Sequence, residues 1–175
     1  MENASKALIM AASILVGVMI ISIGVALFNS FSDFGKSTLN KVEDAKISEW
    51  NNNYLKYYGK ITHTDEKGKE YESPIEVNAH DIVSVSNNAK QNNKNYELEK
   101  QNYDENSYYV QVQVEKDSHF EAKTDEEKNE FLKQNSLIKN DDNTFSTKYY
   151  MCTEIKISPV TKRVMYIKFE EYKEK

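Results

Sequence analysis

The sequence predicts an α+β protein in which a long N-terminal hydrophobic helix, of transmembrane length, precedes a small head domain. No charged residue occurs between Ala7 and Ser32, although the mean hydropathy of the 175-residue chain is -0.75. Helical and alternating strand patterns then follow one another in the polar remainder. We therefore expect residues 1–35 to form the tail and the transmembrane helix, and residues 36–175 to form an amphipathic stalk and one polar head domain.

The apolar run from Ala7 to Phe28 is long enough to cross a lipid bilayer. As a helix it measures about 33 Å, and the hydrocarbon core of a bilayer is about 30 Å thick. A cleaved secretory signal is the main alternative, but its apolar region covers about 7 to 15 residues and follows a basic segment. Met1–Lys6 holds an acid as well as a base. A buried core helix is the other alternative, and the sequence has no second apolar segment to surround it.

Small residues recur on one side of the apolar run. Ser13 and Gly17 are four residues apart, and Gly24 follows Gly17 by one heptad. This spacing forms a stripe that another helix can approach closely. Glycine is also frequent in membrane helices without such a role. The stripe is therefore a candidate assembly surface, with simple tolerance of glycine as the alternative.

The stretch Ser37–Tyr58 predicts a helix that continues out of the membrane as an amphipathic stalk. Gly59 would end this helix, although the run Asn51–Asn53 has poor helix propensity and could end it earlier. Its aromatic face is expected to pack on a sheet. The stripe residues are Leu39, Val42, Trp50, Tyr54 and Tyr57 or Tyr58.

Two shorter helices are predicted by their N-terminal caps. Asn78 is a candidate cap for a helix over Ala79–Gln91, which Asn92–Asn95 would end. Thr124 opens a capping box that starts a short helix through about Gln134. The expected buried contacts of the second helix are Phe131 and Leu132.

Alternation of apolar and polar residues predicts the strands. Lys60–Ile75 is expected to form a hairpin, and strands are expected over Tyr96–Glu99 and Ser107–Glu115. Phe145–Ser158 and Arg163–Tyr172 should pair antiparallel. Turns are expected at Asp65–Gly68, Asp141–Thr144 and Pro159–Lys162. The expected apolar contacts of the last two strands are Ile155, Ile157, Val164, Tyr166, Ile167 and Phe169, and their wet face holds Glu154, Lys156, Lys168 and Glu170.

No motif indicates an enzyme, a cofactor or a metal. His63, His80 and His119 lie in no ligand spacing, so surface histidines are expected. Asn140–Asn143 lacks the alternating ligands of a calcium loop and predicts a turn. Cys152 is the sole cysteine, and in a strand without a nearby activating group it is expected to be a small core residue. We therefore expect a non-enzymatic protein with no cofactor and no small-molecule substrate.

The charge of the chain argues against nucleic acid as a partner. For the topology, the charges next to the span and the composition of the head point to opposite sides of the membrane. Glu2 and Lys6 cancel, so the whole formal charge of -5 lies on residues 32–175. The lysines that follow the span slightly favour a cytoplasmic head by the positive-inside rule. A head rich in Tyr, Asn and Thr is more typical of an exposed surface domain. We expect an extracellular head.

An uncharged N-terminal helix that continues as a stalk, followed by helices and an antiparallel sheet, resembles type IV pilins and pseudopilins, including subunits of Tad-like systems. The resemblance covers the whole layout and is carried by Glu2, the run Ala7–Phe28 and the stalk Ser37–Tyr58. It implies that the apolar helices bundle in a filament core, with Glu2 neutralising Lys6 or the amino terminus of a neighbouring subunit. The family places a glutamate at the fifth position of its apolar segment, whereas Glu2 precedes the run here.

The sequence thus predicts a membrane-anchored structural subunit or accessory of a pilus-like or secretion-like surface assembly. Its partners would be membrane lipid and copies of itself or related subunits. The alternative is a single-pass, membrane-tethered binding or sensing module for a protein or glycan, in which the helix is only an anchor. A membrane-tethered enzyme has the least support. The candidate helix–helix assembly residues are Glu2, Lys6, Ser13, Gly17 and Gly24.

Overall fold

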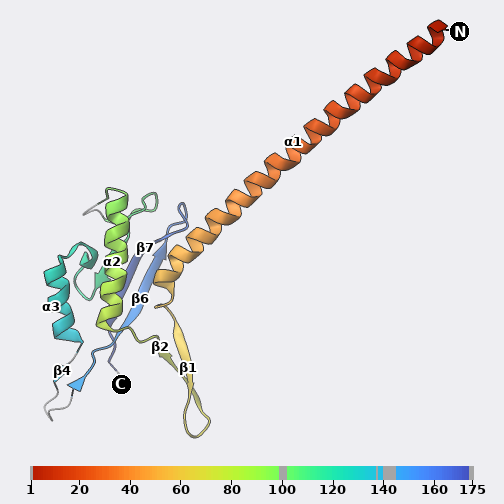
Figure 1. Cartoon of the computed structure of the whole chain (residues 1–175). Helices are drawn as coiled ribbons and strands as arrows, with labels where there is room; N and C mark the ends of the chain where they lie inside the picture. Colours follow the sequence, from red (N-terminus) through yellow and green to blue (C-terminus); the bar gives the residue numbers. More distant parts are fainter. Residues whose placement is uncertain (1, 99–101, 137, 140–144, 174–175) are drawn as a thin grey trace. The chain divides into compact units, whose positions relative to one another are not determined.

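The computed structural model describes residues 2–98, 102–136, 138–139 and 145–173 and has the predicted α+β layout (Figure 1). A long apolar helix at the N-terminus is followed by a small domain of strands and short helices. The chain divides into two compact units, Met1–Lys46 and Ile47–Lys175. The boundary lies within the first helix, so the last turns of this helix belong to the head.

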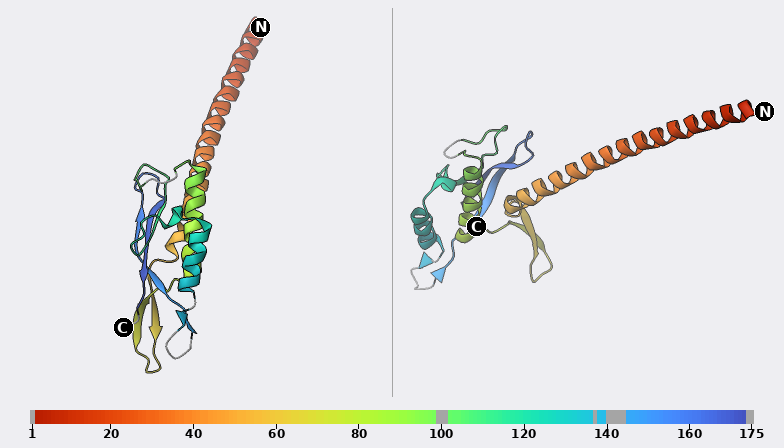
Figure 2. Two further views of the ribbon diagram at one scale, coloured as in Figure 1. Left: turned by 90° about the vertical axis from the view of Figure 1, so that its left-hand side faces the viewer. Right: turned by 45° about the horizontal axis from the view of Figure 1, so that its top comes forward.

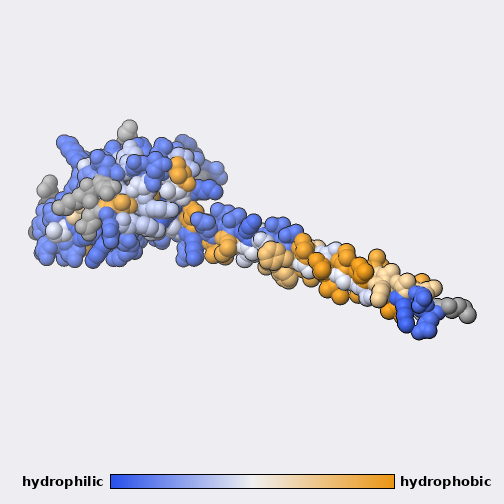
Figure 3. Space-filling view, turned by 90° about the horizontal axis from the view of Figure 1, so that it is seen from above, coloured by the Kyte–Doolittle hydropathy of each residue, from blue (hydrophilic) through white to orange (hydrophobic). Residues whose placement is uncertain are grey.

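Helix α1 runs without interruption over Glu2–Leu55, a length of 54 residues. The predicted span and stalk are therefore one helix, and Asn51–Asn53 does not break it. It is long and apolar enough to cross a membrane by length and composition, and its apolar segment is not buried within the chain. Figure 3 shows apolar side chains gathered along this helix, next to the charged residues at its N-terminal end. Leu8 and Phe28 are 73% and 74% exposed.

The main sheet of the head has three strands in the order β3-β7-β6. Strands β6 and β7 pair antiparallel as predicted, through partners such as Ile155 and Ile167. Strand β3 pairs parallel with β7, placing Val112 beside Ile167, so this sheet is mixed. A parallel pair requires a long crossover, and here the chain between β3 and β7 contains α3 and β6. The strands span Gln111–Val114 (β3), Tyr150–Ile157 (β6) and Val164–Glu171 (β7).

Two helices form where their N-terminal caps predict them, and both caps are capping boxes. In α2, Asn78 accepts a hydrogen bond from the backbone N–H of Asp81, and in α3 Thr124 accepts one from Glu127. Helix α2 lies against the sheet, with α3 beyond it (Figure 2). Its apolar stripe enters the core of the head. The helices span Ala79–Asn95 (α2), Phe120–Ala122 (the short 3-10 helix η1) and Asp125–Asn135 (α3); the core residues of α2 include Ile82, Val85 and Ala89.

The predicted hairpin consists of β1 (Lys60–Thr64) and β2 (Glu70–Pro74), which pair antiparallel and form a separate two-stranded sheet. A second small pair joins β4 (Ile138–Lys139) to β5 (Phe145–Ser146). The turn predicted at Asp141–Thr144 lies outside the described residues.

The strand predicted over Tyr96–Glu99 is wrong in its described part. Tyr96 caps α2, and Glu97 has a φ of 55° in a tight turn, where the N–H of Leu98 donates to the carbonyl of Asn93. Glu99 lies outside the described residues. The asparagine-rich end of α2 thus extends the helix by four residues past Gln91 and then turns the chain, which leaves no extended segment for a strand.

Other strand predictions need smaller corrections. The strand expected over Ser107–Glu115 is reduced to Gln111–Val114. Ile157, expected among the apolar contacts, is 45% exposed, because β6 is irregular next to it and turns it outward. Tyr166 is buried, but its hydroxyl donates to the Gln113 side chain at 2.8 Å on the polar face of the sheet.

Candidate functional site

The predicted assembly residues lie on one stripe of α1. Successive residues of an α-helix are rotated by about 100°, so Ser13, Gly17 and Gly24 fall within an arc of about 40°. Apart from the neighbouring residues and the nearby backbone of the helix itself, a Cβ added at Gly17 or Gly24 would meet no described atom within 4 Å. The stripe is therefore a low surface that the described residues leave uncovered.

The polar groups near this stripe are already paired within the helix. The Lys6 ammonium lies 3.0 Å from the Glu2 carboxylate, one helical turn away. The Ser13 hydroxyl donates to the carbonyl of Ile9 at 2.7 Å. The structure thus joins Glu2 and Lys6 within one chain, and the end of the helix presents a neutral pair to its surroundings.

The other end of α1 is built into the head. The Asn51 amide donates to the carbonyl of Lys162 at 2.8 Å, and its oxygen accepts from the N–H of Val164 at 2.8 Å. Tyr54 is fully buried in the core, and the Arg163 guanidinium lies 4.1 Å from the centre of the Trp50 ring. Residues of α1 thereby hold the turn between β6 and β7.

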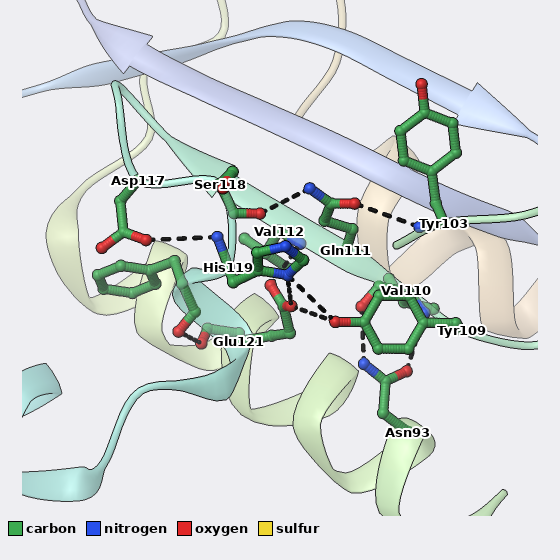
Figure 4. Close-up of polar contacts among 12 residues, drawn as sticks. Asn93, Tyr103, Tyr109, Val110, Gln111, Val112, Asp117, Ser118, His119 and Glu121 are labelled. Carbon is green, nitrogen blue, oxygen red and sulfur yellow. Dashed lines mark hydrogen bonds and ion pairs between the residues drawn. The ribbon is translucent and has the colours of Figure 1, made fainter. Parts of the chain in front are cut away.

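A buried polar cluster surrounds Glu121, whose exposed fraction is 1%. Its carboxyl accepts from the Tyr109 hydroxyl at 2.6 Å and from the N–H of Val112 at 2.7 Å, and His119 Nδ1 lies 3.1 Å from it. Figure 4 shows Tyr109, His119 and Glu121 pointing toward one another. Burial, followed by the bond to Glu121, raises the pKa of Tyr109. The cluster holds the outer edge of β3.

The side chain of Asn93 lies along the same edge, beside Val110. The Asn93 side chain donates to the carbonyl of Val110 at 2.8 Å and accepts from its N–H at 2.8 Å, in the manner of a neighbouring strand (Figure 4). The Asn92 amide donates to the carbonyl of Tyr108 at 2.6 Å. These contacts hold the segment that leads into β3. Sequence reasoning missed both asparagines, although each lies on the apolar stripe of α2.

One cleft in the head lies beside η1 and α3. It has a volume of about 460 Å³, an aromatic floor of Phe120 and Phe131 and a charged rim. Lys123 pairs with Asp117 at 2.7 Å across this rim. The pairing neutralises part of the rim, so the cleft is an amphipathic hollow.

A second cleft, of about 450 Å³, lies between α2 and α3. Lys128 is 2% exposed there and donates to the Asn87 amide oxygen at 2.9 Å. Burial, followed by the charge of Lys90, lowers the pKa of Lys128 to about 8. An ammonium at this depth was not foreseen from the polar sequence of α3.

The histidines and the cysteine take separate places. His63 stacks on Tyr71, His80 is exposed and His119 joins the Glu121 cluster. Cys152 is buried as predicted, and burial raises the pKa of its thiol to about 12. Among the described residues, no group of three or more His, Cys, Asp or Glu could hold a metal ion. The calcium-like run Asn140–Asn143 lies outside them.

Comparison with protein-family models, curated proteins and solved structures gives no match to this chain. The residues and their geometry are therefore the basis of the functional proposal.

Proposed function

We propose that the chain is a non-enzymatic, membrane-anchored structural subunit or accessory of a pilus-like or secretion-like assembly at the cell surface. Copies of the chain, or related subunits, would meet through the N-terminal helix. The observation that carries this proposal is α1 itself, a single helix with an uncovered apolar segment at one end and a residue of the head core, Tyr54, near the other.

The uncovered apolar segment requires an apolar environment. Removing a large aliphatic or aromatic side chain from water stabilises it by about 1.5 to 3 kcal/mol, and Leu8 and Phe28 are two of many such side chains along α1. Lipid and a bundle of like helices both meet this requirement. Within lipid, helices associate through close packing, which small residues allow. Ser13, Gly17 and Gly24 provide such a surface.

The continuity of α1 favours an assembly subunit over a simple tether. A binding module on an anchor needs only a flexible linker, typically rich in Gly, Ser or Pro. Here helical residues lead from the apolar segment directly to Asn51, which is bonded to the sheet. An assembly formed through the helices would then connect to each head through helical backbone rather than through a linker.

The neutral pair at the start of α1 also supports association. An unpaired charge near a bundle of apolar helices is costly. Because Glu2 already pairs with Lys6, the end of the helix can approach another helix without carrying a lone charge. In an assembly, Glu2 could exchange this partner for Lys6 of a neighbouring chain without a change in net charge.

The proposed topology places the head outside the cell. Treating intact cells with protease should then remove the head and leave a membrane-protected fragment that contains residues 7–28. A head that resists protease until the cells are lysed would place it in the cytoplasm and contradict the surface assembly.

The helix contact is tested by Gly17→Leu in the full chain, reconstituted in lipid vesicles. The added side chain separates helices that meet at the stripe, so we expect self-association, measured by energy transfer between labelled chains, to weaken about tenfold or more. Ala26→Leu is the matched control. It lies nine residues from Gly17, which is about half a turn away on the opposite face.

Equal association of Gly17→Leu, Ala26→Leu and the unmodified chain would contradict the proposed helix contact. Purely monomeric behaviour at every protein-to-lipid ratio would favour the tethered binding module. In that case the head should keep its ligand when residues 1–35 are removed.

A further inference from the structure

The β1–β2 hairpin is unusually uncovered. Every residue of β1 is exposed, and among the described strands β1 pairs only with β2. Two-stranded hairpins are marginally stable in water unless another strand or a helix covers them. Ile61 and Tyr71 nevertheless remain about half exposed on one face of the hairpin. A further strand at its edge would supply the missing support.

The hydrogen-bond register shows which backbone groups are free. The N–H of Asp65 donates to Lys69, and the N–H of Ile75 donates to Gly59. In an antiparallel pair the bonded positions alternate, so the odd-numbered residues of β1 face β2. The outward N–H and C=O groups of β1 therefore belong to Lys60, Thr62 and Thr64.

The two outer edges of the hairpin differ in how they are protected. On β2 the outward positions are Glu70, Glu72 and Pro74, which combine two negative charges with a residue that has no N–H. Charges and proline are the devices by which edge strands avoid further pairing. The edge of β1 has one charge, Lys60, at its first position, and its centre at Thr62 is neutral. It is the edge left open.

We infer that the outer edge of β1 pairs antiparallel with the same edge of a second copy, so that two hairpins form a four-stranded sheet. Centred on Thr62, this register places Thr62 opposite Thr62 of the partner subunit and Lys60 opposite the partner's Thr64. The two lysines then lie at opposite ends of the contact. Such a two-fold, self-complementary contact is the commonest kind between identical chains.

Charge favours a contact between copies through this edge over one through the edge of β2. The corresponding β2 contact would place Glu72 opposite Glu72 of the partner subunit, and like charges directly opposite are destabilising. The β1 contact opposes no like charges and leaves the acids of β2 in water. It adds a contact between heads to the proposed contact between helices, and it deepens that function by supplying a second surface through which subunits meet.

The test compares two proline variants of the full chain in detergent micelles. Thr62 and Glu72 are cross-strand partners whose N–H groups both point out of the hairpin. Proline at either position keeps the backbone bonds between β1 and β2 and removes one outward donor, and Glu72→Pro also removes the ion pair of Glu72 with Lys60, which is 3.0 Å long and exposed. We expect Thr62→Pro to raise the dissociation constant of the dimer about tenfold or more, and Glu72→Pro to leave it unchanged.

A second measurement does not depend on proline. Thr62→Cys, with Cys152→Ala to remove the native thiol, should form a disulfide-linked dimer under mild oxidation, because directly opposed strand residues have the required spacing. Glu72→Cys in the same background should not. Equal crosslinking of the two variants, or a dimer that Thr62→Pro does not weaken, overturns the inference.

Gly17→Leu, measured in parallel, separates this contact from the proposed helix contact. Association that responds to Thr62→Pro and not to Gly17→Leu supports the edge contact and counts against the helix contact. Association that responds to Gly17→Leu and not to Thr62→Pro overturns the edge contact and leaves the proposed function in place.

Discussion

In the N-terminal unit, polar side chains form hydrogen bonds with residues that are near in the sequence. In the head, they form hydrogen bonds with residues that are distant in the sequence. Lys6, Ser13 and Ser22 each bond to a group four residues away. Asn51 bonds to a carbonyl 111 residues away, and Asn93 to one 17 residues away. The span therefore forms from local interactions in any apolar environment, while the head depends on tertiary contacts between polar groups.

The burial of the apolar side chains also differs between the two units. In the span the large apolar residues are exposed, whereas in the head Tyr54, Ile82 and Phe169 are fully buried. Substitutions that remove polar side chains should therefore unfold the head and leave the helix of the span intact.

The largest expected effect is that of Glu121→Ala. It leaves the buried N–H of Val112 without an acceptor and removes the 2.6 Å acceptor of the Tyr109 hydroxyl, whose remaining contact is His119 Nδ1 at 3.4 Å. A buried group that loses its partner costs about 1 to 3 kcal/mol. We expect the free energy of unfolding of the head to fall by about 3 kcal/mol or more. Denaturant titration of the full chain in micelles, followed by Trp50 fluorescence, measures it.

Glu130→Ala is the control, since Glu130 is exposed on α3. Far-ultraviolet circular dichroism should show that the helix of the span persists when the head of the Glu121→Ala variant has unfolded. A loss below about 1 kcal/mol would mean that other groups satisfy these donors, and the dependence on long-range polar contacts would fail at this site.

A smaller effect is expected at Asn51, where α1 enters the head. Asn51→Ala removes both bonds to the β6–β7 turn and should lower the free energy of unfolding by about 2 kcal/mol. Asn52→Ala is the matched control, because Asn52 is exposed and alanine is the better helix former. If both variants had the same stability, the long-range bonds of Asn51 would not stabilise the head, and the contrast between the two units would fail at this residue.

Much of the fold was predictable because its signals are local. The N-cap residue Asn78 and the capping box at Thr124 mark α2 and α3, and alternation marks β6 and β7. The parallel pairing of β3 with β7 was not predictable from such signals. It joins segments separated by η1, α3 and the strands β4, β5 and β6, and no local pattern encodes that choice.

The buried polar residues were missed for a related reason. Pattern analysis assigns Asn, Glu and Lys to the surface, because their burial depends on partners that only the tertiary fold supplies. Asn93 gave a readable signal, since it falls on the apolar stripe of α2. Glu121 and Lys128 gave none, because their acceptors and donors come from other elements.

Over a single pH unit, the smallest expected effect is a pH dependence of stability that comes from Lys128. The pKa of Lys128 is about 8 in the folded chain against an ordinary 10.5, because burial and Lys90 outweigh the acids Asp125 and Glu121. Between these pH values the unfolded chain holds a proton that the folded chain has released. Stability therefore rises with pH in this window, by at most about 1.4 kcal/mol per pH unit.

The unmodified chain should thus gain stability relative to Lys128→Met as the pH rises from 8 toward 10.5. The comparison is between two chains because Cys152 acts in the opposite sense. Its pKa is raised from 9.0 to about 12, so its contribution to stability falls as pH rises, equally in both chains. Lys133→Met, at an exposed position of α3, controls for the loss of a lysine from this helix. A difference between the unmodified chain and Lys128→Met that does not change with pH would mean that water reaches the Lys128 ammonium, and the contribution of its burial would fail.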